Sequence, residues 1–146
     1  MEVDMENKRF YPKIGRMFWA ILIPSEIFML AMNALWIFYP GGPLSVIVIV
    51  GTFVLLNYFL LTPCFGFVEF REKALFVKFG FFMKREIPYD KIRGIEKARK
   101  FYSDSMLSLK NDMEHLNIKY NKFDIISVSI KDEENFIREL KLRAGI

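Results

Sequence analysis

The chain has 146 residues, a length that suits one ordinary domain, and its 21 Lys and Arg against 17 Asp and Glu give a net charge of +4. Cys64 is the only cysteine, which excludes an intrachain disulfide and a zinc site built on paired cysteines. His115 is the only histidine, and no Gly-rich phosphate loop follows a strand pattern. We therefore expect no enzyme activity, no cofactor and no metal. Because no recognition motif accompanies the basic residues, we also expect no nucleic-acid partner.

Residues 17–62 predict a hairpin of two transmembrane helices, because Glu26 is their single charged side chain. The apolar runs 17–39 and 44–62 are each close to the roughly 20 residues that cross a bilayer. Between them, residues 40–43 read Pro-Gly-Gly-Pro, a strong turn signal. A cleaved signal peptide is disfavoured, because the first run is too long and a second follows directly.

The charges that flank the hairpin predict its orientation. Basic residues precede the first helix and follow the second, whereas the turn is uncharged: Lys8, Arg9, Lys13 and Arg16 lie before, and Arg71, Lys73 and Lys78 after. Positive flanks stay in the cytoplasm. We therefore expect a multi-pass protein of a bacterial cell membrane with both termini cytoplasmic. Residues 1–16 would form a basic tail and residues 63–146 a cytoplasmic domain.

Three polar residues, Glu26, Asn33 and Asn57, interrupt the apolar runs. Asn33 falls on nearly the same helical face as Glu26, and Asn57 lies at a similar depth in an antiparallel second helix. A Glu26–Asn57 hydrogen bond would hold the hairpin together. The alternatives are that Glu26 meets a membrane-active ligand or another subunit, or that it reaches the interface because the span is shifted.

Residues 67–146 predict a small α+β or barrel-like domain with about six antiparallel strands and a C-terminal helix. Apolar and polar residues alternate in the strand candidates, which are 67–71, 75–79, 83–87, 92–98, 116–120 and 126–130. Residues 101–114 read as a loop. Ser129 and Asp132 form a capping-box pattern before an amphipathic helix whose apolar face includes Phe136 and Leu140.

Four segments resemble a known bacterial domain family. They are residues 74–80 (ALFVKFG), 87–92 (IPYDKI), 116–120 (LNIKY) and the ending from Val128 to Phe136. From about residue 60 to 143 the chain resembles the bacterial pleckstrin-homology-like (PH-like) domain of the YyaB-like type, which two transmembrane helices usually precede. The resemblance implies a PH-like fold. Because some membrane-bound relatives protect their producer against bacteriocins, it also implies a self-immunity role as one alternative.

Residues 84–100 concentrate positive charge, with seven basic and three acidic side chains. The basic members are Lys84, Arg85, Lys91, Arg93, Lys97, Arg99 and Lys100. They form either a solvated strand face or a surface that contacts anionic lipid headgroups, since the anchor keeps the domain near the leaflet.

The sequence as a whole favours a non-enzymatic, membrane-anchored binding or scaffold module on the cytoplasmic face. Its expected partners are the lipid bilayer, anionic headgroups, and a membrane protein or membrane-active peptide. A bacteriocin self-immunity protein is the first alternative, and a small subunit of a membrane complex such as a transporter is the second.

Overall fold

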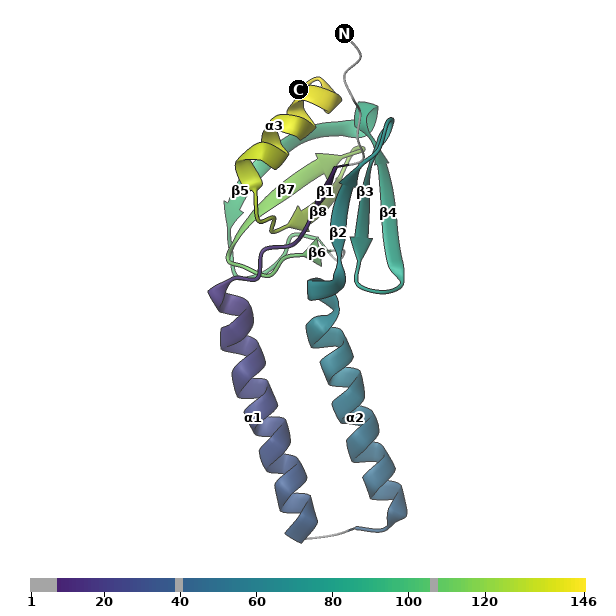
Figure 1. Cartoon of the computed structure of the whole chain (residues 1–146), viewed down its shortest axis with the longest axis vertical. Coiled ribbons are helices and arrows are strands. Elements are labelled where there is room, and N and C mark those ends of the chain that lie inside the picture. The colour runs from purple at the N-terminus through teal and green to yellow at the C-terminus, as the bar shows by residue number, and fades with distance from the viewer. Residues whose placement is uncertain (1–7, 39–40, 106–107) are drawn as a thin grey trace.

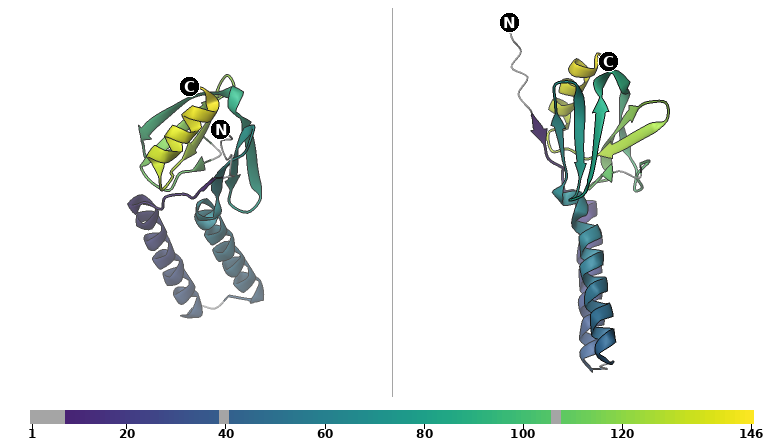
Figure 2. Two further views of the ribbon diagram at one scale, coloured as in Figure 1. Left: turned by 45° about the horizontal axis from the view of Figure 1, so that its top comes forward. Right: turned by 90° about the vertical axis from the view of Figure 1, so that its right-hand side faces the viewer.

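Two long apolar helices extend from one end of a β-rich domain in the computed structural model, which describes residues 8–38, 41–105 and 108–146 (Figure 1). These helices are α1 (Arg16–Phe38) and α2 (Pro43–Leu61). Seen from the side they form a narrow stalk below the domain (Figure 2). Both are long and apolar enough to cross a membrane. Tyr39 and Pro40, at the end of the first predicted span and the start of the predicted turn, lie outside the described residues.

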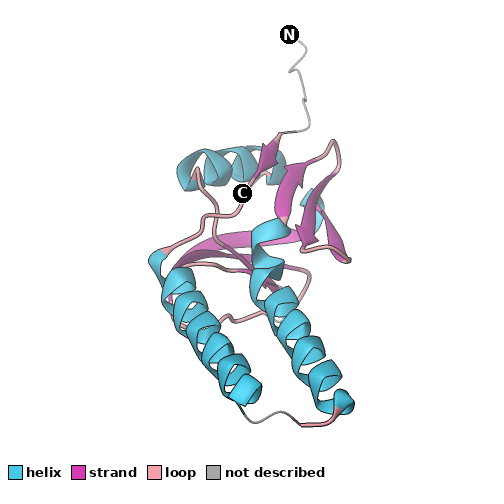
Figure 3. Ribbon diagram, turned by 60° about the horizontal axis from the view of Figure 1, so that its bottom comes forward, coloured by secondary structure: helices cyan, strands magenta, loops and turns pink. Residues whose placement is uncertain are grey.

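Local sequence explains where α2 begins and ends. Gly42 is its extended N-cap and Pro43 its first residue, where a proline's missing N–H costs no helical hydrogen bond. At the other end Pro63 cannot continue the α-helical hydrogen-bond ladder, and the chain tightens into the 3₁₀ helix η1 (Thr62–Phe65) before entering the sheet. Figure 3 shows that both helices meet the domain on the same side.

The domain consists of two four-stranded sheets and a C-terminal helix. The first sheet has the order β1-β2-β3-β4, and the second has the order β5-β7-β8-β6; among the described residues, only β6 and β8 run parallel. The remaining elements are β1 (Arg9–Phe10), β2 (Phe67–Phe70), β3 (Ala74–Phe79), β4 (Met83–Pro88), η2 (Tyr89–Lys91), β5 (Ile92–Arg99), β6 (Ser108–Leu109), β7 (Glu114–Tyr120), β8 (Asp124–Val128) and α3 (Glu133–Ala144).

One hydrophobic core joins both sheets to α3. Phe136 and Leu140 of α3 are fully buried, and the Phe136 ring lies 5.3 Å from the rings of both Phe10 and Phe70. Leu75 and Val77 of β3 point into the same core, as their period-two spacing predicted. The predicted class, antiparallel sheets with a C-terminal helix, is confirmed. The structure adds the two-residue strands β1 and β6.

The segment before α1 belongs to the domain, which corrects the prediction of a basic tail as far as the described residues go. Arg9 and Phe10 pair with Glu69 and Val68 of β2, and Phe10 is a core residue. Further along, the Lys13 amide donates to the Ser129 carbonyl (2.8 Å). The domain is therefore built from chain on both sides of the helical hairpin. Residues 1–7 of the predicted tail lie outside the described residues.

The predicted helix cap at Ser129 is wrong. The N-cap of α3 is Asp132, and it makes no side-chain cap hydrogen bond. Ser129 is buried, and its hydroxyl donates to the Glu114 carbonyl (3.3 Å) while accepting from the Asn111 amide (3.4 Å). The Ser129 hydroxyl therefore forms hydrogen bonds beside β7 and does not cap α3.

Part of the predicted loop 101–114 is ordered against the sheet. Ser108 and Leu109 form β6, which pairs with β8, and Leu109 is fully buried. The Lys110 ammonium group donates to the carbonyls of Lys100 (2.5 Å) and Tyr102 (2.9 Å), which ties down the start of the loop. Met106 and Leu107 lie outside the described residues.

Candidate functional site: the helix-proximal end of the domain

The domain has a helix-proximal end and a distal end. At the proximal end the β3–β4 turn packs closely against η1. A Cβ added at Gly80 would lie only 2.3 Å from the Thr62 methyl group. At the distal end the β7–β8 turn meets η2, where the Asn121 amide donates to the Lys91 carbonyl (3.0 Å). Figure 1 shows the β3–β4 turn beside the upper end of α2. Any contact between the domain and a surface crossed by the helices must use the proximal end.

An aromatic groove of about 450 Å³ runs along the outer face of the first sheet to its proximal end. Its lining combines aromatic and charged residues: Arg9, Phe67, Glu69, Arg71, Phe76, Lys78, Phe81, Phe82, Met83 and Lys84. The Arg71 guanidinium lies 3.9 Å from the centre of the Phe76 ring. This pairing is a cation–π contact, which lets a charged side chain lie flat on an apolar surface.

Glu69 sits at the base of the aromatic groove as a buried carboxylate. It pairs with Arg9 and, at 3.2 Å, with Arg71. Burial opposes the ionisation of Glu69, but the hydrogen bonds from Arg9 and Arg71 outweigh it, and the pKa of the carboxyl group lies below its ordinary value. The carboxylate therefore joins β1 to β2 by charge as well as by backbone pairing.

A second groove, which we call the α1 groove, lies where the chain enters α1 and encloses about 770 Å³. It is lined by Lys13, Ile14, Gly15, Arg16, Met17, Ala20, Arg99, Phe101, Asp112, Met113 and Glu114. Lys13 and Asp112 form an ion pair (3.1 Å) across it. A Cβ at position 15 would lie 2.1 Å from the Asp112 carboxyl carbon, so a larger residue there would displace the Asp112 side chain. The exposed cations Arg16 and Arg99 leave the α1 groove positive at the helix root.

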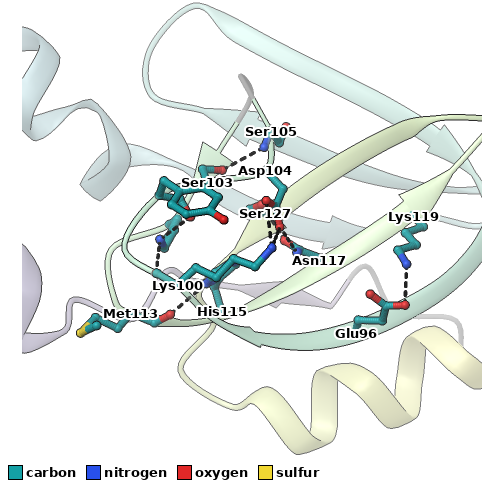
Figure 4. Close-up of polar contacts among 12 residues, drawn as sticks. Glu96, Lys100, Ser103, Asp104, Ser105, Met113, His115, Asn117, Lys119 and Ser127 are labelled. Carbon is teal, nitrogen blue, oxygen red and sulfur yellow. Dashed lines mark hydrogen bonds and ion pairs between the residues drawn. The ribbon is translucent and has the colours of Figure 1, made fainter.

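A chain of polar side chains anchors the loop after β5 to the second sheet (Figure 4). Lys100 contacts the Asp104 carboxylate (3.0 Å), which accepts from the Asn117 amide (2.9 Å). The Ser127 hydroxyl in turn donates to Asn117 (2.7 Å). The hydrogen bond from Lys100 holds the pKa of Asp104 below its ordinary value. These side chains satisfy one another's hydrogen-bonding groups and hold the loop in a fixed position.

His115 is a buried residue of β7. Its Nδ1 lies 3.0 Å from the Met113 carbonyl, and its Nε2 has no hydrogen-bond partner among the described residues. The position suits the packing role that is usual for a lone histidine.

The structure separates the seven basic residues that were predicted as candidates for contact with the membrane or a partner. Lys84 and Arg85 begin β4 beside the proximal turn, whereas Lys91 and Arg93 lie at the distal end, in η2 and at the start of β5. The other three come late in the stretch: Lys97 pairs with Glu133 (2.8 Å), Lys100 pairs with Asp104, and Arg99 lines the α1 groove. Of the seven, the proximal cations without an ion pair among the described residues are Lys84, Arg85 and Arg99.

The predicted Glu26–Asn57 hydrogen bond is absent from the described residues. The Asn57 amide donates to the Phe53 carbonyl (3.1 Å) and the Asn33 amide to the Met29 carbonyl (2.7 Å), each one turn back in its own helix. Glu26 Oε1 is buried without a hydrogen-bond partner. Hydrogen bonds to the local backbone compete with hydrogen bonds between the helices, and both amides form the local bond. A functional role for Glu26 stays a prediction.

Two features of the site were not predicted. The first is the ion-paired Glu69, whose partner Arg9 lies 60 residues earlier in the chain. The second is the β3–β4 turn with the first residue of β4, where the consecutive residues Phe81, Phe82 and Met83 are 49%, 84% and 56% exposed. The consecutive apolar residues after Gly80 could have indicated this exposed surface from the sequence, because turns are ordinarily polar.

We predict that Glu69 contributes an acid-sensitive part of the domain's stability. Its pKa is lowered in the fold, so its contribution is present above the unfolded pKa of about 4.3 and is lost as the pH falls through the folded pKa. Glu69→Gln should lower the melting temperature at pH 7 and flatten its fall between pH 6 and pH 3. Glu72→Gln, in the exposed β2–β3 turn, is the matched control. An acid profile of Glu69→Gln identical to that of the control would refute the role of this carboxylate.

Comparison with known proteins bears on the β-rich part of the chain. Residues 68–144 match the family model of the bacterial PH domain. No curated protein and no solved structure matches the chain. The match covers both sheets except β1 and the first residue of β2, Phe67, and it covers the whole of α3. The chain therefore belongs to the bacterial PH domain family.

Proposed function

We propose that this chain is a non-enzymatic binding module that two transmembrane helices anchor to the cytoplasmic leaflet of a bacterial cell membrane. The observation that carries the proposal is the surface of α2, which has no charged residue and no buried side chain. A helix that is apolar on all sides requires an apolar environment around it. α1 carries Arg16 at its start and Glu26 within it, but its surface is otherwise largely apolar, with Phe28 66% and Leu30 62% exposed.

The attachment of the helices supports a rigid placement of the domain. α1 enters through Gly15, whose amide donates to the Asn111 carbonyl (3.0 Å), and α2 leaves through η1, which packs against the β3–β4 turn. Both helix roots are therefore held by the folded domain. An anchored PH domain would present the same end to the leaflet at all times and its distal end and α3 to the cytoplasm.

The basic residues at the proximal end suit anionic headgroups. Arg16 and Arg99 lie at the root of α1, and Lys84 and Arg85 lie beside the root of α2. A cation near an anionic leaflet contributes about 1 kcal/mol of attraction, which salt screens. The roles as a bacteriocin self-immunity protein or as a transporter subunit stay predictions from the sequence.

Cysteine accessibility tests the anchor and its orientation. In a Cys64→Ala background, single cysteines are placed at Gly42, between the helices, and at the exposed positions Tyr11 and Ile146 of the domain. In intact bacterial cells a membrane-impermeant maleimide should label position 42 alone. Positions 11 and 146 should react only after the membrane is opened. Labelling of 11 or 146 in intact cells would contradict the cytoplasmic placement.

Lipid selectivity tests the headgroup contact. In bilayers that contain spin-labelled lipids, the full chain should prefer phosphatidylglycerol to phosphatidylcholine, and 1 M salt should remove the preference as the Debye length falls to about 3 Å. The triple variant Lys84→Ser, Arg85→Ser and Arg99→Ser should lose most of it. The control removes the same charge from the distal end, with Lys91→Ser, Arg93→Ser and Lys122→Ser. Equal selectivity in the two triple variants would exclude the proximal cations as headgroup ligands.

A further inference from the structure

The β3–β4 turn exposes the largest run of consecutive apolar side chains in the described part of the PH domain. We call Phe81, Phe82 and Met83 the aromatic turn. Phe82 is 84% exposed, and both of its neighbours are about half exposed. Isolated exposed apolar residues are normal on soluble surfaces, but a contiguous group marks a surface that meets an apolar partner.

The aromatic turn is held against the end of α2. The Phe81 ring stacks on Tyr58 of α2 at 5.9 Å with an interplanar angle of 25°, and it lies 4.8 Å from the Phe65 ring of η1. The Phe82 ring is 6.3 Å from the same Tyr58 ring. Gly80 allows this approach, because its φ of +62° is unfavourable for other residues and a Cβ would collide with Thr62. The turn is therefore fixed to the end of α2 and to η1, between Tyr58 and Phe65.

The length of α2 sets the depth of that level. Its 19 residues span about 28 Å at 1.5 Å per residue, close to the roughly 30 Å of hydrocarbon in a bilayer. The apolar span continues through η1 to Phe65, 23 residues in all, which places Leu61 at or just inside the edge of the hydrocarbon. Tyr58 is three residues further in, about 4.5 Å along the axis. The Phe81 ring contacts both Tyr58 and Phe65, so it lies between the depths of these two residues, at the edge of the hydrocarbon.

Charge and residue type agree with that position. Lys78 of β3 and Lys84 of β4 occupy opposite positions in the strand pair, just above the aromatic turn. Lipid phosphates would lie at this level. Aromatic rings below a row of lysines are the arrangement that membrane interfaces favour, because rings rest at the headgroup boundary and ammonium groups reach outward.

We propose that the aromatic turn is a lipid-binding element of the PH domain, inserted into the interfacial layer of the leaflet beside α2. The inference rests on the proposed transmembrane anchor and adds a part of the domain itself to the membrane-embedded surface. The occupant is bilayer lipid: acyl chain and glycerol against Phe81 and Phe82, and phosphate against Lys78 and Lys84. The insertion would prevent the domain from tilting away from the leaflet.

Depth measurements on the full chain in lipid nanodiscs test the proposal. Nitroxide labels are placed singly, in a Cys64→Ala background, at Phe82, at Phe123 and at Leu55. Phe123 is the matched control, because it is 83% exposed against 84% for Phe82 but lies in the distal turn. Leu55, in the middle of α2, reports on the anchor itself. Each labelled chain is used only if it keeps the protease resistance of the unlabelled chain.

The expected result is a graded one. Oxygen should reach the label at 55 best and the label at 82 next, while a water-soluble nickel complex should reach only the label at 123. An aqueous label at 82 together with a buried label at 55 overturns the inference and leaves the anchor standing. An aqueous label at 55 overturns the anchor, and the inference with it. A label at 82 that is shielded from both reagents indicates a protein partner and also overturns the lipid assignment.

A second measurement keeps an aromatic side chain at the tested position. With Trp19 and Trp36 replaced by Phe, the substitutions Phe82→Trp and Phe123→Trp each provide a single fluorophore. Lipids brominated near the headgroup end of the acyl chain should quench the fluorescence of the Phe82→Trp variant and leave that of the Phe123→Trp variant unchanged. Equal fluorescence of the Phe82→Trp variant in brominated and ordinary bilayers would contradict insertion.

Discussion

The pairing of β1 with β2 is the constraint on which the rest of the structure depends. Arg9 and Phe10 precede α1 and β2 follows α2, so this pairing closes the chain across the whole helical hairpin. Phe10 contributes an aromatic ring to the core, edge-on to Phe70 and Phe136, and Glu69 adds a buried carboxylate paired with Arg9. Aromatic packing and a satisfied buried charge together hold a strand of only two residues, which backbone hydrogen bonds alone would not.

Closure at the base gives the proximal end its defined geometry. Since both helix roots are tied to one core, the proximal end of the aromatic groove lies beside the end of α2, and the α1 groove lies at the root of α1. Phe101 lines the α1 groove with Met17 and Ala20, much as Phe81 stands beside Tyr58. The domain would meet a leaflet through aromatic and basic residues at both roots, and a ligand would find the distal surface in a constant orientation.

Periodic features were predictable from the sequence, and contacts between distant segments were not. The two long apolar runs predicted the helices, and alternation at Leu116, Ile118 and Tyr120 predicted β7. β1 could not be predicted, because two residues have no period and their partner strand comes about 60 residues later. The basic stretch looked continuous because β4 and β5 are adjacent in sequence, but they belong to different sheets. The cap predicted at Ser129 failed because tertiary bonds to Glu114 and Asn111 engage its hydroxyl.

The stability of a Phe10→Ala variant tests most directly whether the segment before α1 is part of the PH domain. Phe10 is 5% exposed and contacts both sheet and helix, so the truncation should cost about 3–5 kcal/mol. At roughly 1–3 kcal/mol per molar urea, the unfolding midpoint of the domain should fall by about 1 M or more, measured by pulse proteolysis of the full chain in detergent micelles. Tyr11→Ala, at the exposed neighbouring position, should leave the midpoint almost unchanged. Equal midpoints for the two variants would contradict a domain closed across the hairpin.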